Sequence, residues 1–241
     1  MPGLKATLFI YLMCWGASIH AQDTLREPFT ISIYANLGFP SPQLKKAVNN
    51  SINGTALGIG TNMLFNLHGK KRSPSPLALG IDIDYFYFGR DKIEETSSSP
   101  PYKTSYNLWN LSGIARLILS KRSTGFVPFV DGMLGMKTFS VRTKIDKDAI
   151  DYALGDREED IIGIKNYNGL GYGVGLGWFT RKPKDYGNEA SFSLRLMYLW
   201  GDEIEYIKRG TLEVDGSGNL TFETGFTNTN MILVQLGVTI H

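Results

Sequence analysis

The chain has 241 residues, and its 25 lysine and arginine residues nearly balance its 23 aspartate and glutamate residues. This balance gives no basis for nucleic-acid binding, and a single cysteine, Cys14, excludes an intramolecular disulfide. The length fits one domain with a full core or one barrel.

The first element in chain order is a secretory signal peptide at residues 1–21. Lys5 precedes an apolar run from Ala6 to Ala17, and small and polar residues follow up to Ala21. This order is typical of a leader that is cut between Ala21 and Gln22. The apolar run is shorter than the ~20 residues that a spanning helix needs. The predicted mature domain therefore covers residues 22–241 and contains no cysteine.

The rest of the chain alternates apolar residues with polar or small ones, and we find no helical periodicity of any length. Strict alternation predicts β-strands with one apolar face. Eight candidate strands follow in chain order, at 29–37, 56–67, 77–87, 109–119, 126–137, 168–179, 191–200 and 232–240.

The sixth candidate strand, "NGLGYGVGLGWF", has a glycine at every second position. These glycines are Gly169, Gly171, Gly173, Gly175 and Gly177. A dinucleotide loop needs glycines at i, i+2 and i+5, but the last offset falls on Val174, Leu176 or Trp178. We therefore interpret the segment as a strand with one apolar face and one bare face.

The connections between candidate strands alternate between long and short. The long ones are 38–55, 88–105, 140–167 and 201–230, and the short ones are 68–76, 120–125 and 180–189. In a soluble two-sheet sandwich nothing requires long and short connections to alternate. An outer-membrane barrel does require this alternation, because its periplasmic turns are short and its external loops are long. The sequence thus predicts an all-β, eight-stranded antiparallel up-and-down transmembrane β-barrel in the outer membrane of a Gram-negative bacterium.

Aromatic residues on the apolar faces support the same topology, because lipid-facing bands end in aromatic belts at both interfaces. The predicted periplasmic belt contains Phe29, Phe65, Phe126, Trp178 and Phe192. The predicted external belt contains Tyr85, Tyr87, Trp109, Tyr172, Tyr198 and Trp200.

The other face of each strand points into a lumen that side chains can just fill. The glycine wall lies opposite Ala56, Gly58 and Gly60 of the second strand, which leaves room for long polar side chains. The expected lumen charge network is Asp82, Asp84, Arg116, Asp131 and Arg195, whose charges can pair. Two interpretations remain: a plug of paired charges, or a narrow conduit in which the glycine wall is free space for ions or a small ligand.

Three segments resemble a known family: the leader ending in Ala21–Gln22, the strand "FVPFVDGMLGM" and the terminal "MILVQLGVTIH". Together they resemble the small outer-membrane β-barrel superfamily of OmpA/OmpX type, in versions typical of Bacteroidota. Lipid A acylases and deacylases also occur on this fold, with a histidine near a serine at the external rim. Here His68 and His241 fall at the opposite rim, so we expect no enzyme, no cofactor and no metal site, and we interpret the acidic run "DREED" as solvated.

The last long connection contains a hairpin signal at 211–223, where two short alternating runs flank "DGSGN". We expect a ribbon that projects from the membrane and offers a protein partner an exposed edge. The function predicted is structural or recognitive at the cell surface, in contact with outer-membrane lipid and without nucleic acid. The alternatives are a conduit for a small solute similar to the OmpW type, and an accessory component of a secretion or gliding complex similar to the PorT family.

Overall fold

The computed structural model describes residues 29–48, 55–67, 76–93, 102–120, 125–145, 161–181, 190–208, 211, 213–214 and 220–240. Several predictions lie outside these residues. They are the signal peptide at 1–21, the acidic run at 156–160, the turn of the hairpin at 215–219, and both His68 and His241.

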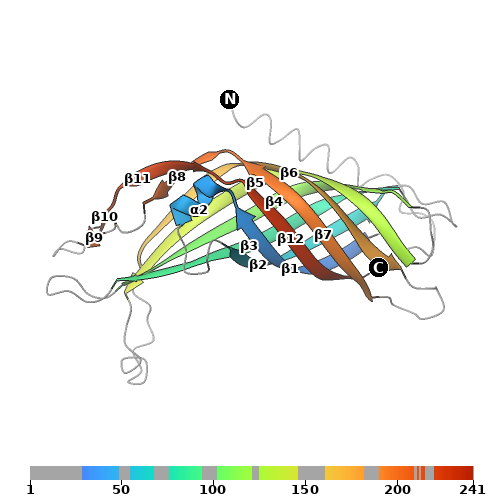
Figure 1. Cartoon of the computed structure of the whole chain (residues 1–241), viewed down its shortest axis with the longest axis horizontal. Coiled ribbons are helices and arrows are strands. Elements are labelled where there is room, and N and C mark those ends of the chain that lie inside the picture. The colour runs from blue at the N-terminus through green and yellow to red at the C-terminus, as the bar shows by residue number, and fades with distance from the viewer. Residues whose placement is uncertain are drawn as a thin grey trace, which may run out of the picture.

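Eight antiparallel strands close into a barrel (Figure 1). They are β1 (Phe29–Pro40), β2 (Ala56–Asn66), β3 (Leu77–Ile93), β4 (Tyr102–Ile118), β5 (Gly125–Ile145), β6 (Ile161–Arg181), β7 (Ala190–Gly201) and β12 (Met231–Ile240). Neighbours in the chain pair around the ring, and β12 closes it against β1. The predicted eight-stranded up-and-down barrel is confirmed. We call the end of the barrel at the connections after β1, β3, β5 and β7 the loop end, and the other the turn end.

The exterior of the barrel is apolar, and its interior contains most of the polar side chains of the strands. Ile33, Leu111 and Val174 are among the many large apolar residues that are exposed on the outer face, while Ser32, Asn110 and Asp131 are buried on the inner face. This is the reverse of a water-soluble barrel and matches strands that alternate apolar-out and polar-in across a bilayer.

Both predicted aromatic belts are present. At the turn end, the ring of Trp178 lies 4.9 Å from that of Phe126 and 5.5 Å from that of Phe192. At the loop end, Tyr85 lies 4.8 Å from Trp109, and Trp200 contacts Tyr172 at 5.5 Å and Tyr198 at 4.5 Å. The two belts mark the limits of the apolar band.

Four strands continue past the loop-end belt, which corrects two of the expected loops. β3 and β4 have 17 residues each, and β5 and β6 have 21 each. Much of 88–105 and 140–167 is therefore paired strand, and the connection between β3 and β4 shrinks to 94–101. The outward residues of the extensions are mostly polar, with Ile164 an exception, so the apolar alternation largely stops at the aromatic belt while the hydrogen-bonded ladder continues.

A short helix, α2 (Pro42–Val48), follows β1 at the loop end (Figure 1). Ser41 caps it, since its Oγ accepts from Leu44 N at 3.3 Å and its carbonyl from Lys45 N, and proline suits the first helical position. Seven residues are too few to show helical periodicity, so the sequence did not reveal α2. Among the described residues, no helix combines the length and the apolar character needed to span a membrane.

The connection between β7 and β12 forms the ribbon. β8 (Glu203–Ile207) pairs with β11 (Thr224–Asn228), and β9 (Glu213–Val214) pairs with β10 (Leu220–Thr221). The hairpin pairing predicted around "DGSGN" is thus confirmed. The ribbon does not project freely at its base, because Ile204 and Ile207 are buried in the same apolar cluster as α2.

Candidate functional site

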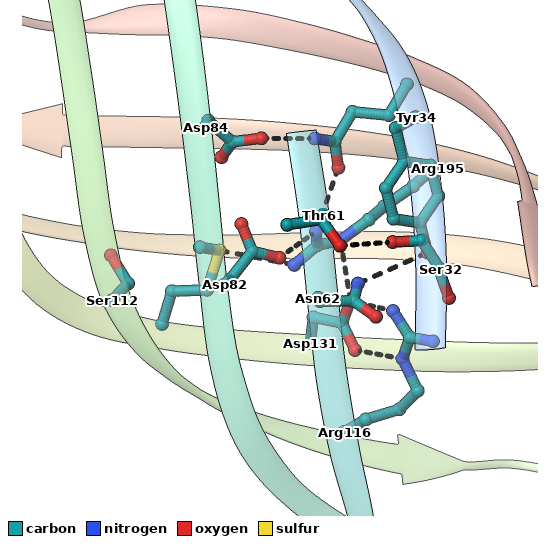
Figure 2. Close-up of polar contacts among 12 residues, drawn as sticks. Ser32, Tyr34, Thr61, Asn62, Asp82, Asp84, Ser112, Arg116, Asp131 and Arg195 are labelled. Carbon is teal, nitrogen blue, oxygen red and sulfur yellow. Dashed lines mark hydrogen bonds and ion pairs between the residues drawn. The ribbon is translucent and has the colours of Figure 1, made fainter. Parts of the chain in front are cut away.

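The centre of the lumen is built around Arg195, a fully buried side chain on β7 (Figure 2). Its Nη1 donates to Asp82 Oδ2 at 2.7 Å and to Gln235 Oε1 at 2.8 Å. Its Nε lies 2.7 Å from Asp131 Oδ2 in an ion pair, although the N–H is not directed at that oxygen. β3 and β7 are four strands apart in the ring of eight. The bond between Arg195 and Asp82 therefore crosses the lumen from one wall to the opposite wall.

Arg116 on β4 is the second arginine that binds the carboxylate of Asp131. The two residues are directly opposite across β4 and β5, and Arg116 Nε and Nη2 donate to the two carboxylate oxygens at 2.8 and 2.9 Å. The Arg116 guanidinium also lies 3.8 Å above the Phe129 ring centroid. A two-pronged contact of this kind fixes the guanidinium in one orientation.

Asp84 differs from the other two buried aspartates because amide groups, and no arginine, hold its carboxylate. Asn36 Nδ2 and Gln235 Nε2 donate to Oδ1 at 2.8 and 2.9 Å, and Asn110 Nδ2 donates to Oδ2 at 3.4 Å. Gln235 contacts Arg195 through its carbonyl oxygen and Asp84 through its amide nitrogen. One glutamine thus links the two halves of the network.

Lys137 lies towards the loop end and is 1% exposed. Its Nζ donates to the backbone carbonyl of Thr229 at 2.9 Å. The contact joins the wall at β5 to the segment that leads into β12. A buried lysine on this carbonyl ties the ribbon connection to the barrel.

The glycine wall is covered by side chains from neighbouring strands. A Cβ at Gly171 would meet Lys137, one at Gly173 would meet Leu199, one at Gly175 would meet Met197, and one at Gly177 would meet Phe129. On the opposite wall, Gly60 is covered by Asp84 and Asn36. The residues that cover Gly171 to Gly177 belong to the flanking strands β5 and β7, and none of the five charged residues expected in the lumen is among them.

Apolar layers lie above and below the network. Towards the loop end, Phe86, Leu108, Leu199 and Leu233 pack in one buried cluster with residues of α2 and β8. Towards the turn end, Val127, Phe129 and Phe179 form a second cluster. The network is thus a polar layer between two hydrophobic layers.

The structure places all five residues of the expected charge network inside the barrel. It brings Asp82, Arg116, Asp131 and Arg195 into contact, whereas the hydrogen bonds to Asp84 come from amide groups. Sequence reasoning did not single out Asn36, Asn110 and Gln235, which hold Asp84. It also did not single out Lys137, or Tyr34, whose hydroxyl accepts from Asn62 Nδ2 at 3.2 Å. Each of these lies at an inward position of the alternation. Whether they contact the charged residues depends on strand register, and the alternation of apolar and polar residues does not give the register.

Within the part of the chain that the structure describes, no group of three histidine, cysteine, aspartate or glutamate side chains could hold a metal ion. The charged side chains of the network are buried and hydrogen-bonded to one another or to amide groups. Its chemistry is that of a closed hydrogen-bonded layer.

No protein-family model matches this sequence, and no curated protein matches it. The fold is similar to that of Neisserial surface protein A, at 12% identity and a TM-score of 0.43, over 89% of this chain and 96% of that one. It is similar to Ail, the attachment invasion locus protein of Yersinia pestis, in complex with the heparin analogue sucrose octasulfate, at 11% identity and a TM-score of 0.42, over 88% of this chain and 96% of that one. It is also similar to the N-terminal β-barrel domain of Pseudomonas aeruginosa OprF, at 11% identity and a TM-score of 0.36, over 88% and 96% of the two chains.

These similarities are of overall fold alone. The closed eight-stranded barrel has the architecture expected from the OmpA/OmpX-type resemblance. The link to Bacteroidota stays a prediction.

Proposed function

We propose that this chain is a non-enzymatic outer-membrane barrel with a plugged lumen, which serves a structural or recognition role at the cell surface. The loop end faces outwards and the turn end faces the periplasm. The observation that carries the proposal is the hydrogen bond from Arg195 to Asp82, because it joins opposite walls of the barrel at 2.7 Å. A conduit along the axis needs free space at this level.

The packing around the network supports the plug. Large side chains cover the glycine wall, and Leu44 and Val48 of α2 are buried in the apolar cluster at the loop end. A path for a solute must pass an apolar layer, a charged layer and a second apolar layer. Moving a polar solute from water into either apolar layer is unfavourable.

Conductance in planar bilayers tests the plug against the conduit. We expect no resolvable single-channel current from the refolded wild-type chain. The double variant Asp82→Ser/Arg195→Ser removes the contact between the walls and tests whether the charged layer alone closes the lumen. A wild-type current with a defined ion selectivity favours the OmpW-like conduit and contradicts the plug.

The recognition role rests on the ribbon. Phe226 on β11 is 68% exposed although it lies at the loop end, outside the lipid-facing band. β11 pairs with β8 and also packs against α2, so the exposed Phe226 side chain is the surface that a partner would contact. A photo-crosslinking residue at 226 should capture a partner in native membranes, and one at Phe126 in the turn-end belt should capture lipid. Capture of a secretion-complex component at 226 would favour the PorT-like role, and equal capture at both positions would contradict recognition by the ribbon.

A further inference from the structure

One row of polar side chains crosses six neighbouring strands inside the barrel. Register places its members directly opposite one another from β7 through β12, β1, β2 and β3 to β4. The members are Ser191, Thr239, Ser32, Asn62, Asp82 and Ser112, and each of them is at most 4% exposed. We call these six residues the polar row. Figure 2 shows the part of the row that runs from Ser32 to Ser112.

The polar row climbs from the turn end of the barrel to the charged layer. Ser191 is the second residue of β7 and precedes Phe192 of the turn-end belt. Asp82 reaches Arg195, which is four residues beyond Ser191 on β7, towards the loop end. A row of directly opposed residues climbs in this way because the strands of a closed barrel are staggered. The row therefore joins the turn-end rim to the guanidinium of Arg195.

Two acceptor oxygens of the row lie side by side and need a donor. Asn62 and Asp82 are directly opposite across β2 and β3, which places their Cβ atoms about 5 Å apart. Asn62 Nδ2 donates to the Tyr34 hydroxyl at 3.2 Å, and Asp82 Oδ2 accepts from Arg195 at 2.7 Å. The second oxygens, Asn62 Oδ1 and Asp82 Oδ1, have no hydrogen-bond partner among the described residues. Two acceptors cannot bind each other, so the donor must be a bound molecule.

Two hydroxyl groups nearer the turn end are in the same situation. Ser191 Oγ and Ser193 Oγ are buried and make no hydrogen bond within the described part of the chain. The two serines are two positions apart on β7, so both side chains point into the lumen. A buried polar group without a partner is costly. Ordered water commonly bridges such groups in protein interiors.

The wall that carries the lower part of the row is lined by short hydroxyl side chains. On β7, β12 and β1 the inward residues at the turn end include Ser191, Ser193, Thr239, Thr30 and Ser32. The turn-end apolar cluster, which contains Phe129 and Phe179, lies on β5 and β6 instead. The row thus passes beside this cluster, on a different part of the wall.

We propose that the polar row binds a file of water molecules that runs from the turn end to Asp82 and stops at the charged layer. Water fits because it can donate to Asn62 Oδ1 and Asp82 Oδ1, and can both donate to and accept from the serine hydroxyls. A cation fits less well, since Arg116 and Arg195 already balance the charges of Asp131 and Asp82. This inference goes beyond the proposed plug and rests on it for the level at which the water stops.

The first test is the sign of a stability change. In a dry lumen, Ser193→Ala removes an unsatisfied hydroxyl and should raise the urea midpoint of unfolding in vesicles. With bound water the same change removes a hydrogen bond, and we expect the midpoint to fall by about 0.5 M. The control is Ser32→Ala, because the Ser32 hydroxyl bonds Thr239 Oγ1 at 2.9 Å. It should lower the midpoint in either case.

The second test detects the water directly by NMR on the chain refolded in detergent micelles. Magnetisation transfer from water to the side-chain amide protons of Asn62 should give a cross-peak, although Asn62 is only 1% exposed to bulk solvent. We expect no such peak at the backbone amide protons of Phe86 and Leu233. These two residues are buried in the loop-end cluster, on strands β3 and β12 that also carry members of the row.

Two substitutions of equal shape separate the row from the rest of the lumen. Thr239→Val removes a hydroxyl from the row and should weaken the Asn62 cross-peak. Thr104→Val is the matched control, because Thr104 Oγ1 and Thr143 Oγ1 form a buried hydroxyl pair at 3.1 Å near the loop end. This variant should leave the cross-peak unchanged.

Each outcome decides for or against the water file. A urea midpoint of Ser193→Ala at or above that of the wild-type chain overturns it, and so does absence of the Asn62 cross-peak. Equal weakening by Thr239→Val and Thr104→Val overturns the polar row as the path of the water. All three results leave the plug intact. Cross-peaks at Phe86 and Leu233 as well as at Asn62 would mean that water passes the charged layer, which contradicts the plug itself.

Discussion

Arg116 and Asp131 face each other directly across β4 and β5, and two hydrogen bonds of 2.8 and 2.9 Å join the guanidinium to the carboxylate. Asp131 also pairs with Arg195 at 2.7 Å, so one carboxylate holds two buried cations. This sharing makes Asp131 the position on which the charged layer depends most.

We expect Asp131→Asn to destabilise the barrel by about 3–5 kcal/mol, because it leaves two buried guanidiniums without their shared anion. Asp84→Asn is the matched comparison, since amides and no arginine hold Asp84. Its cost should be smaller, about 1–3 kcal/mol, from one unsatisfied donor. Urea unfolding in vesicles measures both, and a larger cost for Asp84→Asn would contradict the assigned network.

Gly173→Leu should destabilise the barrel by ~1–3 kcal/mol, the usual cost of overpacking. A Cβ at Gly173 would lie 2.6 Å from Leu199 Cδ2 and 3.0 Å from the Tyr198 carbonyl oxygen. Gly132→Leu is the control, because a Cβ at Gly132 on the outer face meets nothing within 4 Å. Equal unfolding free energies for the two variants would mean that the lumen has unfilled space beside β6.

Ile81→Arg should cost ~2–4 kcal/mol, because it places a charge on the lipid face within the apolar band. Ile164→Arg tests depth separately from exposure. The two isoleucines are 47% and 50% exposed, but Ile164 lies on the extension of β6 beyond the loop-end belt. Refolding yield and urea unfolding in vesicles should be affected at position 81 and nearly unchanged at 164. A larger effect at position 164 than at position 81 would mean that the bilayer has been assigned to the wrong height on the barrel.

Orientation can be tested with single cysteines, because the only native cysteine is Cys14 in the predicted leader. Phe226→Cys at the loop end should react with a membrane-impermeant thiol reagent on intact cells. Leu67→Cys, which is at the turn end and also exposed, should react only after the outer membrane is permeabilised. Labelling of Leu67→Cys alone on intact cells would invert the proposed topology.

The lumen shows how far sequence reasoning reaches. Alternation placed Asp82, Asp84, Arg116, Asp131 and Arg195 on inward faces, because side chains on a strand alternate with a period of two. It also placed Asn36, Lys137 and Gln235 there, without any sign that they would meet the charges. Arg195 and Asp82 are 113 positions apart in the chain. Their contact depends on the ring order and on the stagger of the strands.

The loop end was less accessible to sequence reasoning. The apolar alternation ends at the aromatic belt, so the extensions of β3 to β6 looked like loops, and the seven residues of α2 are too short for a periodic signal. The bulge at Gly89, which turns Arg90 and Lys92 outwards, is visible only in the paired register.

The sequence by itself determined the number of membrane strands, the face of each residue between the two aromatic belts, and the belts themselves, because each follows from the period of a single strand and from the chemistry of lipid. The tertiary structure alone decided which inward side chains meet, what covers Gly171 to Gly177 and how the loop end is closed. These features depend on strand stagger and ring closure, which set the relative heights of residues on different strands. No single segment of the sequence contains that information.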